Sequence, residues 1–220
     1  MVNAAETFGI DPAMGHPERA LAFGYAPAGA RDGVVALFAL DATLAKLARH
    51  TREPVAAQLR LAWWRDALGE LQTGPVAGQP LLAAIHAAAL SAGVTGEQLV
   101  RIVDGWEALI ASDIGTYGRD RGGGLFSAAA RVLAAGDAWL GEAGEGWALA
   151  ELATTSPDAA LAKSARMLAE PLLTARRPRV SREGRTLAAL ALSARSDLAA
   201  RAEGSPARIA RLLTLRLTGR

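Results

Sequence analysis

Apolar side chains recur every three or four positions along nearly the whole chain, which is the spacing of one face of an α-helix. The pattern is clearest over 31–52, where it includes Val34, Leu37, Leu40, Leu44 and Leu47. Alanine, the residue with the highest helix propensity, occupies 51 of the 220 positions. We find no alternating pattern long enough for a β-strand and no internal repeat. The sequence predicts an all-α fold in which residues 1–220 form a single helical bundle.

Capping and turn residues divide this pattern into separate helices. Thr95 followed by Gln98 is a capping box, and Ser156, Pro157 and Asp158 are typical of a helix start. Ten Pro and 23 Gly supply the breaks. The predicted helices span, in chain order, 16–27, 31–52, 54–71, 80–92, 95–111, 125–135, 141–154, a segment after 158, 186–202 and 205–217.

A glycine-rich stretch at 112–124 separates two of these helices and ends in three consecutive glycines, Gly122, Gly123 and Gly124. A phosphate-binding loop needs a preceding strand and a following Lys-Ser/Thr pair, and neither is present. We therefore expect these glycines to allow a close approach between backbone segments.

Composition excludes several kinds of site. The chain has no Cys, which excludes disulfides, Cys-ligated zinc, iron–sulfur clusters and a thiol nucleophile. Its three His residues fall at no metal-ligand spacing. Arg or Asp interrupts each apolar run before it reaches the length of a membrane span, and the first thirty residues lack a secretory pattern. The expected location is the cytoplasm.

Charge is unevenly distributed, although the net charge is only +2. Residues 1–162 carry 11 basic and 18 acidic side chains, whereas residues 163–220 carry 13 basic and 4 acidic ones. Twelve of those 13 are Arg, which suits contact with phosphate or anionic headgroups. This basic part predicts peripheral contact with the inner membrane; the alternative is a solvated surface that balances the acidic part of the chain. It lacks interleaved aromatic residues and a helix-turn-helix pattern, so no nucleic-acid partner is expected.

The most specific segment is 52–68, which places the tandem pair Trp63 and Trp64 inside a charged helix. Neighbouring residues lie about 100° apart around a helix, so we expect one of these indoles in the core and the other outside it. Arg60 and Trp64 are four residues apart and could stack. The alternative is a purely structural helix whose indoles fill the bundle.

This segment resembles the squalene/phytoene synthase family, the head-to-head isoprenyl diphosphate synthases. The resemblance is carried, in order, by Ala26 and Pro27, by 36–40, by Glu53 and Pro54 leading to 60–68, by 103–107, and by Tyr117 with 122–129. It is clear over 18–153 and weaker over 209–220. It implies a helical bundle of the isoprenoid (terpenoid) synthase type, shortened after residue 150.

Active members of this family hold Mg²⁺ between two Asp-rich motifs on facing helices, because Mg²⁺ prefers carboxylate oxygens and stabilises the departing diphosphate. The first motif falls on Ala45, Lys46 and Arg49, where no acid remains. The carboxylate nearest to it is Asp41, one turn earlier. In the second motif only Asp158 is acidic, and it is equally typical of a helix cap. We therefore expect no metal site and no cofactor, and the candidate catalytic residues reduce to Asp41, Asp158 and the Tyr117 of the resemblance.

Several basic and aromatic residues are candidates for ligand binding without a metal. Lys46 and Arg49 could contact a diphosphate directly as a pair one turn apart; the alternative is a solvent-facing surface. The tryptophan-containing helix adds Arg60, Trp64 and Arg65.

Three functions are compatible with these features. The first is a catalytically degenerate member that acts as an assembly or interaction factor for a protein partner or membrane-complex subunit, as the resemblance to complex I assembly factors implies. The second is an active transferase that condenses prenyl diphosphates with Mg²⁺ in squalene or phytoene synthesis. The third is a non-catalytic binder of a prenyl diphosphate or lipid, with an apolar cavity and basic residues at its mouth. Carboxylates within about 6 Å of each other across a central cavity would favour the enzyme. A centre filled by Leu, Phe and Trp would argue against both the enzyme and the binder.

Overall fold

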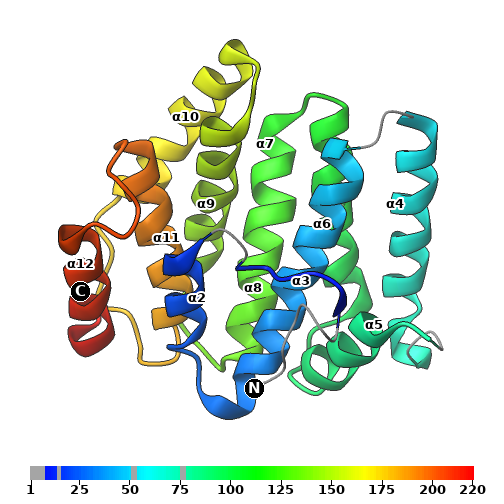
Figure 1. Cartoon of the computed structure of the whole chain (residues 1–220). Coiled ribbons are helices and arrows are strands. Elements are labelled where there is room, and N and C mark those ends of the chain that lie inside the picture. Colours follow the sequence, from blue (N-terminus) through cyan, green and yellow to red (C-terminus); the bar gives the residue numbers. More distant parts are fainter. Residues whose placement is uncertain (1–7, 14–15, 51–53, 75–77) are drawn as a thin grey trace.

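The computed structural model describes residues 8–13, 16–50, 54–74 and 78–220, and all regular elements in these ranges are helical. This confirms the all-α prediction. Figure 1 shows the elements, which are α2 (Pro17–Phe23), α3 (Ala28–His50), α4 (Pro54–Gly69), η1 (Leu71–Thr73), α5 (Pro80–Ile85), η2 (His86–Leu90), α6 (Gly96–Ile110), α7 (Ile114–Thr116), η3 (Tyr117–Gly123), α8 (Gly124–Val132), α9 (Leu140–Thr155), α10 (Ala159–Thr174), α11 (Arg185–Leu198) and α12 (Pro206–Thr218).

The long helices stand side by side, with α4 at one edge of the bundle and α12 at the other (Figure 1). Helix α9 lies between these edges and packs against α8, η3, α10 and α11. It is apolar on nearly all sides, as expected of a helix surrounded by others. At the centre of the bundle, η3 packs between α9 and α6, and Phe38 of α3 contacts Trp147 of α9.

Local capping patterns placed two helix starts correctly. The Thr95 hydroxyl accepts a hydrogen bond from the Gln98 backbone N–H at 3.2 Å, and the Gln98 side chain accepts one from the Thr95 backbone N–H at 3.1 Å. Asp158 caps α10 by accepting hydrogen bonds from the backbone N–H groups of Ala160 and Leu161. The predicted boundary around 52–54 falls partly on residues 51–53, outside the described ranges.

The glycine-rich stretch is not the interruption that the sequence predicted. Residues 114–132 form one continuous helical run, in which η3 is a π-helical segment between α7 and α8. The expected close approach is confirmed: a Cβ added to Gly122 would lie 2.1 Å from the Gly144 carbonyl oxygen, and one added to Gly144 would lie 2.3 Å from that of Gly122. The glycines are needed here for tight packing between η3 and α9.

Two further boundaries differ from the prediction. The helix predicted over 80–92 changes from α-helical to π-helical geometry at His86. The helix predicted over 186–202 ends at Leu198, because the chain turns through Ala200 with a positive φ of 50°. Among the described helices, none combines the length and the apolar character required to span a bilayer.

Candidate functional site

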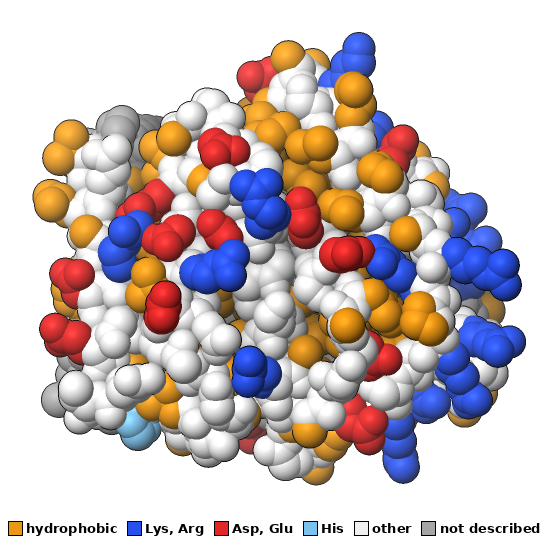
Figure 2. Space-filling model, turned by 180° about the vertical axis from the view of Figure 1, so that it is seen from behind, with side chains coloured by type: hydrophobic (Ala, Val, Ile, Leu, Met, Phe, Trp, Pro, Cys, Tyr) orange, Lys and Arg blue, Asp and Glu red, His pale blue; other side chains and the backbone are white. Residues whose placement is uncertain are grey.

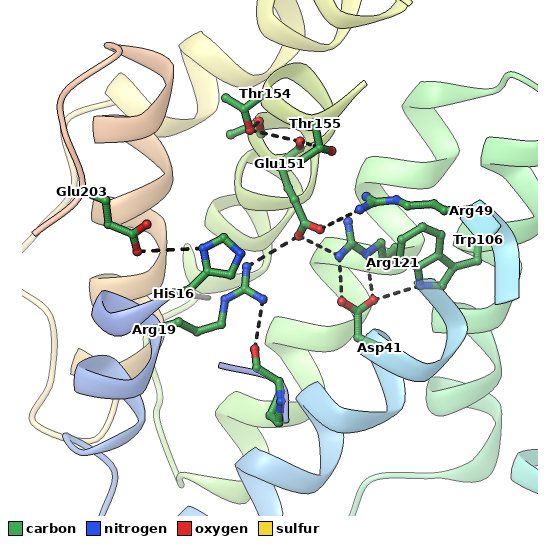
Figure 3. A network of polar contacts seen from close by, with 12 residues as sticks. His16, Arg19, Asp41, Arg49, Trp106, Arg121, Glu151, Thr154, Thr155 and Glu203 are labelled. Carbon is green, nitrogen blue, oxygen red and sulfur yellow. Dashed lines mark hydrogen bonds and ion pairs between the residues drawn. The ribbon is translucent and has the colours of Figure 1, made fainter. Parts of the chain in front are cut away.

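A buried arginine lies at the centre of the bundle. Arg121, on η3, is only 1% exposed and sits between α3 and α9. Its guanidinium donates two hydrogen bonds to Asp41 of α3, from Nε to Oδ1 and from Nη2 to Oδ2, both at 2.7 Å. Nη2 also donates to Oε2 of Glu151 on α9 at 2.9 Å (Figure 3). One guanidinium thus links carboxylates from two different helices.

Aromatic rings surround this guanidinium. Its central carbon lies 4.2 Å from the ring centre of Trp106 and 4.8 Å from that of Trp147, which are cation–π distances. The Trp106 indole N–H donates to Asp41 at 2.9 Å, and the Tyr117 hydroxyl accepts from Arg121. Burial raises the pKa of Tyr117, which keeps the phenol neutral.

Two more arginines approach Glu151, one from each side (Figure 3). Arg49 of α3 donates to Oε1 at 3.2 Å, and Arg19 of α2 lies 3.9 Å from Oε2. Burial disfavours the charged form of Glu151, but the guanidiniums of Arg121, Arg19 and Arg49 outweigh it and hold the pKa of this carboxyl well below its usual range. With three arginines and two carboxylates, the cluster carries a net charge of +1.

The cluster does not fit Mg²⁺. The Asp41 and Glu151 oxygens bound to the same nitrogen lie within about 6 Å of each other, a separation that favours a metal-dependent enzyme. However, the cation between them is the Arg121 guanidinium, which uses the oxygens that a metal would need. Within the described ranges, no three His, Cys, Asp or Glu side chains are arranged to hold a metal ion.

Aromatic side chains fill the rest of the centre. Trp147 packs against Phe38 and Phe126, with ring centres 5.7 and 5.5 Å away. A cavity of about 180 Å³ lies beside them and is lined by Arg19, Arg49 and Glu151, among other polar residues. Pockets that enclose small-molecule ligands typically measure roughly 300–1,000 Å³. Among the described residues, the cavity beside the cluster is therefore smaller than a typical ligand pocket.

The structure brings together only some of the sequence-predicted site residues. Asp41, Tyr117 and Arg49 belong to the cluster. Lys46 is exposed on α3 and does not contact it. Asp158 is exposed at the start of α10, where it acts as a helix cap.

The three candidates on α4 lie at the edge of the bundle, away from the cluster. Trp64 is buried at 7% exposure while Trp63 is 42% exposed, so the predicted division of the two indoles is confirmed. Arg60 is exposed, and no cation–π contact joins it to Trp64 in the described structure. Arg65 pairs with Asp104 and Glu107 of α6, where burial raises the pKa of Glu107 although Arg65 opposes the shift.

Sequence reasoning missed Arg121, Glu151 and Arg19, and it assigned no role to Trp106 and Trp147. Two of these residues carried a usable signal. Arg121 follows Tyr117 by one helical turn and precedes the three glycines of a closely packed segment, and Glu151 interrupts an otherwise apolar stretch of α9. A charged residue in such surroundings requires a charged partner.

Comparison with known protein families gives a match over the first half of the chain. A family model described as squalene/phytoene synthase matches residues 15–118. No curated protein and no solved structure matches. The matched part contains Asp41, Arg49 and Trp106 and ends before Arg121 and Glu151.

Proposed function

Because a squalene/phytoene synthase family model matches residues 15–118, we propose that the chain is a member of this family without diphosphate chemistry and that it acts as an assembly or interaction factor. The observation that carries the proposal is the Arg121 guanidinium between Asp41 and Glu151. Ionisation of a prenyl diphosphate requires cations placed against the departing phosphates. Here the carboxylates that could hold such cations are bound to an internal arginine.

The first Asp-rich motif supports the same proposal. Its positions hold Ala45, Lys46 and Arg49 in place of carboxylates. Arg49 in turn is bonded to Glu151, so it is not free to bind a diphosphate in place of the metal. The small size of the neighbouring cavity argues against a prenyl diphosphate binder at this site.

A protein partner is supported by an exposed apolar row on α4. Val55 and Leu59 are each 68% exposed and Trp63 is 42% exposed; the four-residue spacing places all three on one helix face. Contiguous exposed apolar side chains are typical of interaction surfaces. We propose a membrane-complex subunit as the partner, and a cytoplasmic location at the periphery of the inner membrane.

The absence of turnover is tested by incubating the purified chain with farnesyl or geranylgeranyl diphosphate and Mg²⁺ and measuring pyrophosphate. We expect no release above the protein-free reaction. Release that scales with protein and disappears in Asp41→Ala would overturn the proposal. Asp158→Ala is the matched control, because Asp158 only caps α10.

The interaction role is tested by affinity capture from native membranes with quantitative identification of complex subunits. We expect the tagged wild-type chain to enrich subunits of one membrane complex and Leu59→Asp to lose them. Met167→Asp, at a position that is 66% exposed on α10, is the matched control and should retain them. Equal recovery by all three proteins would contradict a role for the α4 row.

A further inference from the structure

Helix α12 is apolar on two opposite sides. Leu212 and Leu215 are 2% and 7% exposed and pack against the bundle. Leu213 and Leu217 are 43% and 76% exposed. At about 100° per residue, these two leucines lie on the side of the helix that faces away from the core. A helix that only covers the bundle needs apolar residues on one side, so the outer leucines require another explanation.

Exposed arginines lie on the same helix as the outer leucines and on the connector beside it. Arg211, Arg216 and Arg220 of the α12 segment are exposed, as are Arg179 and Arg182 of the preceding connector. The connector is held beside the end of α12, because the Val180 backbone N–H donates to the Gly219 carbonyl oxygen at 3.0 Å. We call Leu213, Leu217 and these five arginines the C-terminal basic face. In Figure 2, Lys and Arg side chains gather along the right-hand edge, over the C-terminal helices.

These arginines are not neutralised by nearby acids. Within the described ranges, none of the five forms an ion pair. Three of the four acidic residues after position 162 are engaged elsewhere: Glu170 with Arg166, Asp197 with Arg208 and Glu203 with His16. The fourth, Glu183, directly follows Arg182 and forms no ion pair within the described ranges. Five arginines beside this one acid leave the face positively charged and available to an external anion.

A groove opens beside the same face. It has a volume of about 410 Å³ and runs between the ends of α10 and α12 and the side of α11. Leu172, Leu173 and Leu192 supply apolar lining, whereas Arg176, Arg195 and Arg220 supply positive charge. Arg220 belongs both to the groove and to the C-terminal basic face. This combination suits a molecule with an anionic head and an apolar tail.

We propose that the C-terminal basic face docks on an anionic phospholipid bilayer. Helix α12 lies in the plane of the interface, with Leu213 and Leu217 among the acyl chains and the arginines on lipid phosphates. The groove accommodates the tail of one lipid. The inference deepens the proposed membrane location and rests on that part of the proposed function alone, since it holds whether or not the chain has catalytic activity.

Vesicle sedimentation with the full chain tests the proposal. We expect binding to vesicles of phosphatidylglycerol mixed with phosphatidylcholine and little binding to phosphatidylcholine alone. Raising the ionic strength from about 0.1 to about 1 M shortens the screening length from about 10 to about 3 Å and should release most of the bound chain. The double variant Arg211→Gln/Arg220→Gln should lower the partition coefficient about 10- to 30-fold.

Leu217→Asp should reduce binding at least about 10-fold, because it removes an inserted leucine and adds a negative charge. The milder Leu217→Ala should give a smaller loss. Leu59→Asp on α4 is the matched control, since it changes an equally exposed leucine outside the face and should leave vesicle binding unchanged. Circular dichroism checks that each variant is folded.

Three outcomes would overturn the proposal: no binding of the wild-type chain to anionic vesicles, equal binding to neutral vesicles, or the same loss in Leu59→Asp as in Leu217→Asp. A free-phosphate site is distinguished by competition, because inorganic phosphate at constant ionic strength should not displace the chain from vesicles. Displacement by phosphate would assign the arginines to a soluble anion. These results are independent of pyrophosphate release and of partner capture, so failure here is separable from failure of the proposed function.

Discussion

Arginines inside the bundle and arginines at its C-terminal end have opposite surroundings. Arg121 and Arg208 are 1% and 3% exposed, and each has carboxylate oxygens within 2.7 Å. Arg211 and Arg220 are exposed and form no ion pair in the described structure. The interior charges are therefore satisfied by one another, whereas those at the C-terminal end remain available for binding. This comparison is the basis for the docking that we propose at the C-terminal surface.

The second buried arginine shows that ion pairing inside the bundle joins distant helices. Arg208 of α12 bonds Glu18 of α2 and Asp197 of α11. Burial opposes ionisation of Glu18, but hydrogen bonds from Arg208, the Gly204 N–H and Ser193 lower the pKa of its carboxyl. This network attaches the first described helix to the last two, as Arg121 attaches η3 to α3 and α9.

The largest expected effect is the loss of the central guanidinium. Arg121→Met leaves Asp41 and Glu151 buried without their shared cation, which typically costs about 3–5 kcal/mol of unfolding free energy. Urea denaturation measures this change. Arg119→Met, at an exposed position of the same η3 segment, should change stability by less than about 0.5 kcal/mol. Similar values for the two variants would remove the distinction between interior and surface arginines.

The next largest effect is expected where η3 packs closely against α9. Gly122→Ala places a methyl group 2.1 Å from the Gly144 carbonyl oxygen, which should cost about 1–3 kcal/mol through displacement of η3 from α9. Gly124→Ala is the control, because its Cβ would meet nothing closer than 3.7 Å. Thermal unfolding compares the two, and a Gly122→Ala protein as stable as the wild type would show that the approach is looser than described.

The acid sensitivity of Glu151 gives a third prediction. Its folded pKa is held well below the unfolded value by Arg121, Arg19 and Arg49, so its contribution to stability is present above about pH 4.5 and is lost as the pH falls below that value. The slope from this one group reaches at most about 1.4 kcal/mol per pH unit. Between neutral and acidic pH, the free energy of unfolding should therefore change less with pH for Glu151→Gln than for the wild type. Parallel pH profiles would contradict the ionised state of Glu151.

The smallest effect is expected at a partly exposed pair. Arg65→Gln removes the contacts with Asp104 and Glu107, whose side chains are each 35% exposed. Such pairs contribute about 0–1 kcal/mol, and high salt should reduce the difference further. The same urea titration measures the loss of unfolding free energy. A loss as large as that of Arg121→Met would show that this partly exposed pair stabilises the fold as much as the buried cluster does.

Local sequence patterns were sufficient for the fold class and for many helix starts. The capping box of Thr95 and Gln98 and the cap at Asp158 involve residues within three positions of each other, so they are readable without tertiary information. The motif comparison also identified Asp41 as the acid that remains near the first Asp-rich motif. Its partner was not readable from the chain, because Arg121 is 80 positions away and Glu151 lies 30 positions beyond Arg121.

In the glycine-rich segment, local sequence predicts a helix break that tertiary packing prevents. Gly122, Gly123 and Gly124 have low helix propensity and predict a break. The structure keeps them helical because packing against α9 compensates for that low propensity. Only the tertiary contact with Gly144 decides between a loop and a close helix crossing.

The cation between Asp41 and Glu151 is the Arg121 guanidinium, and we expect these ion pairs to leave no Mg²⁺ site there. The most direct measurement is a calorimetric titration of Mg²⁺ into the wild-type chain in the presence of inorganic pyrophosphate. We predict no saturable heat beyond that of Mg²⁺ binding to pyrophosphate alone. Saturable binding to the protein with a dissociation constant below about 1 mM, retained by Asp158→Asn and absent from Asp41→Asn, would contradict the account.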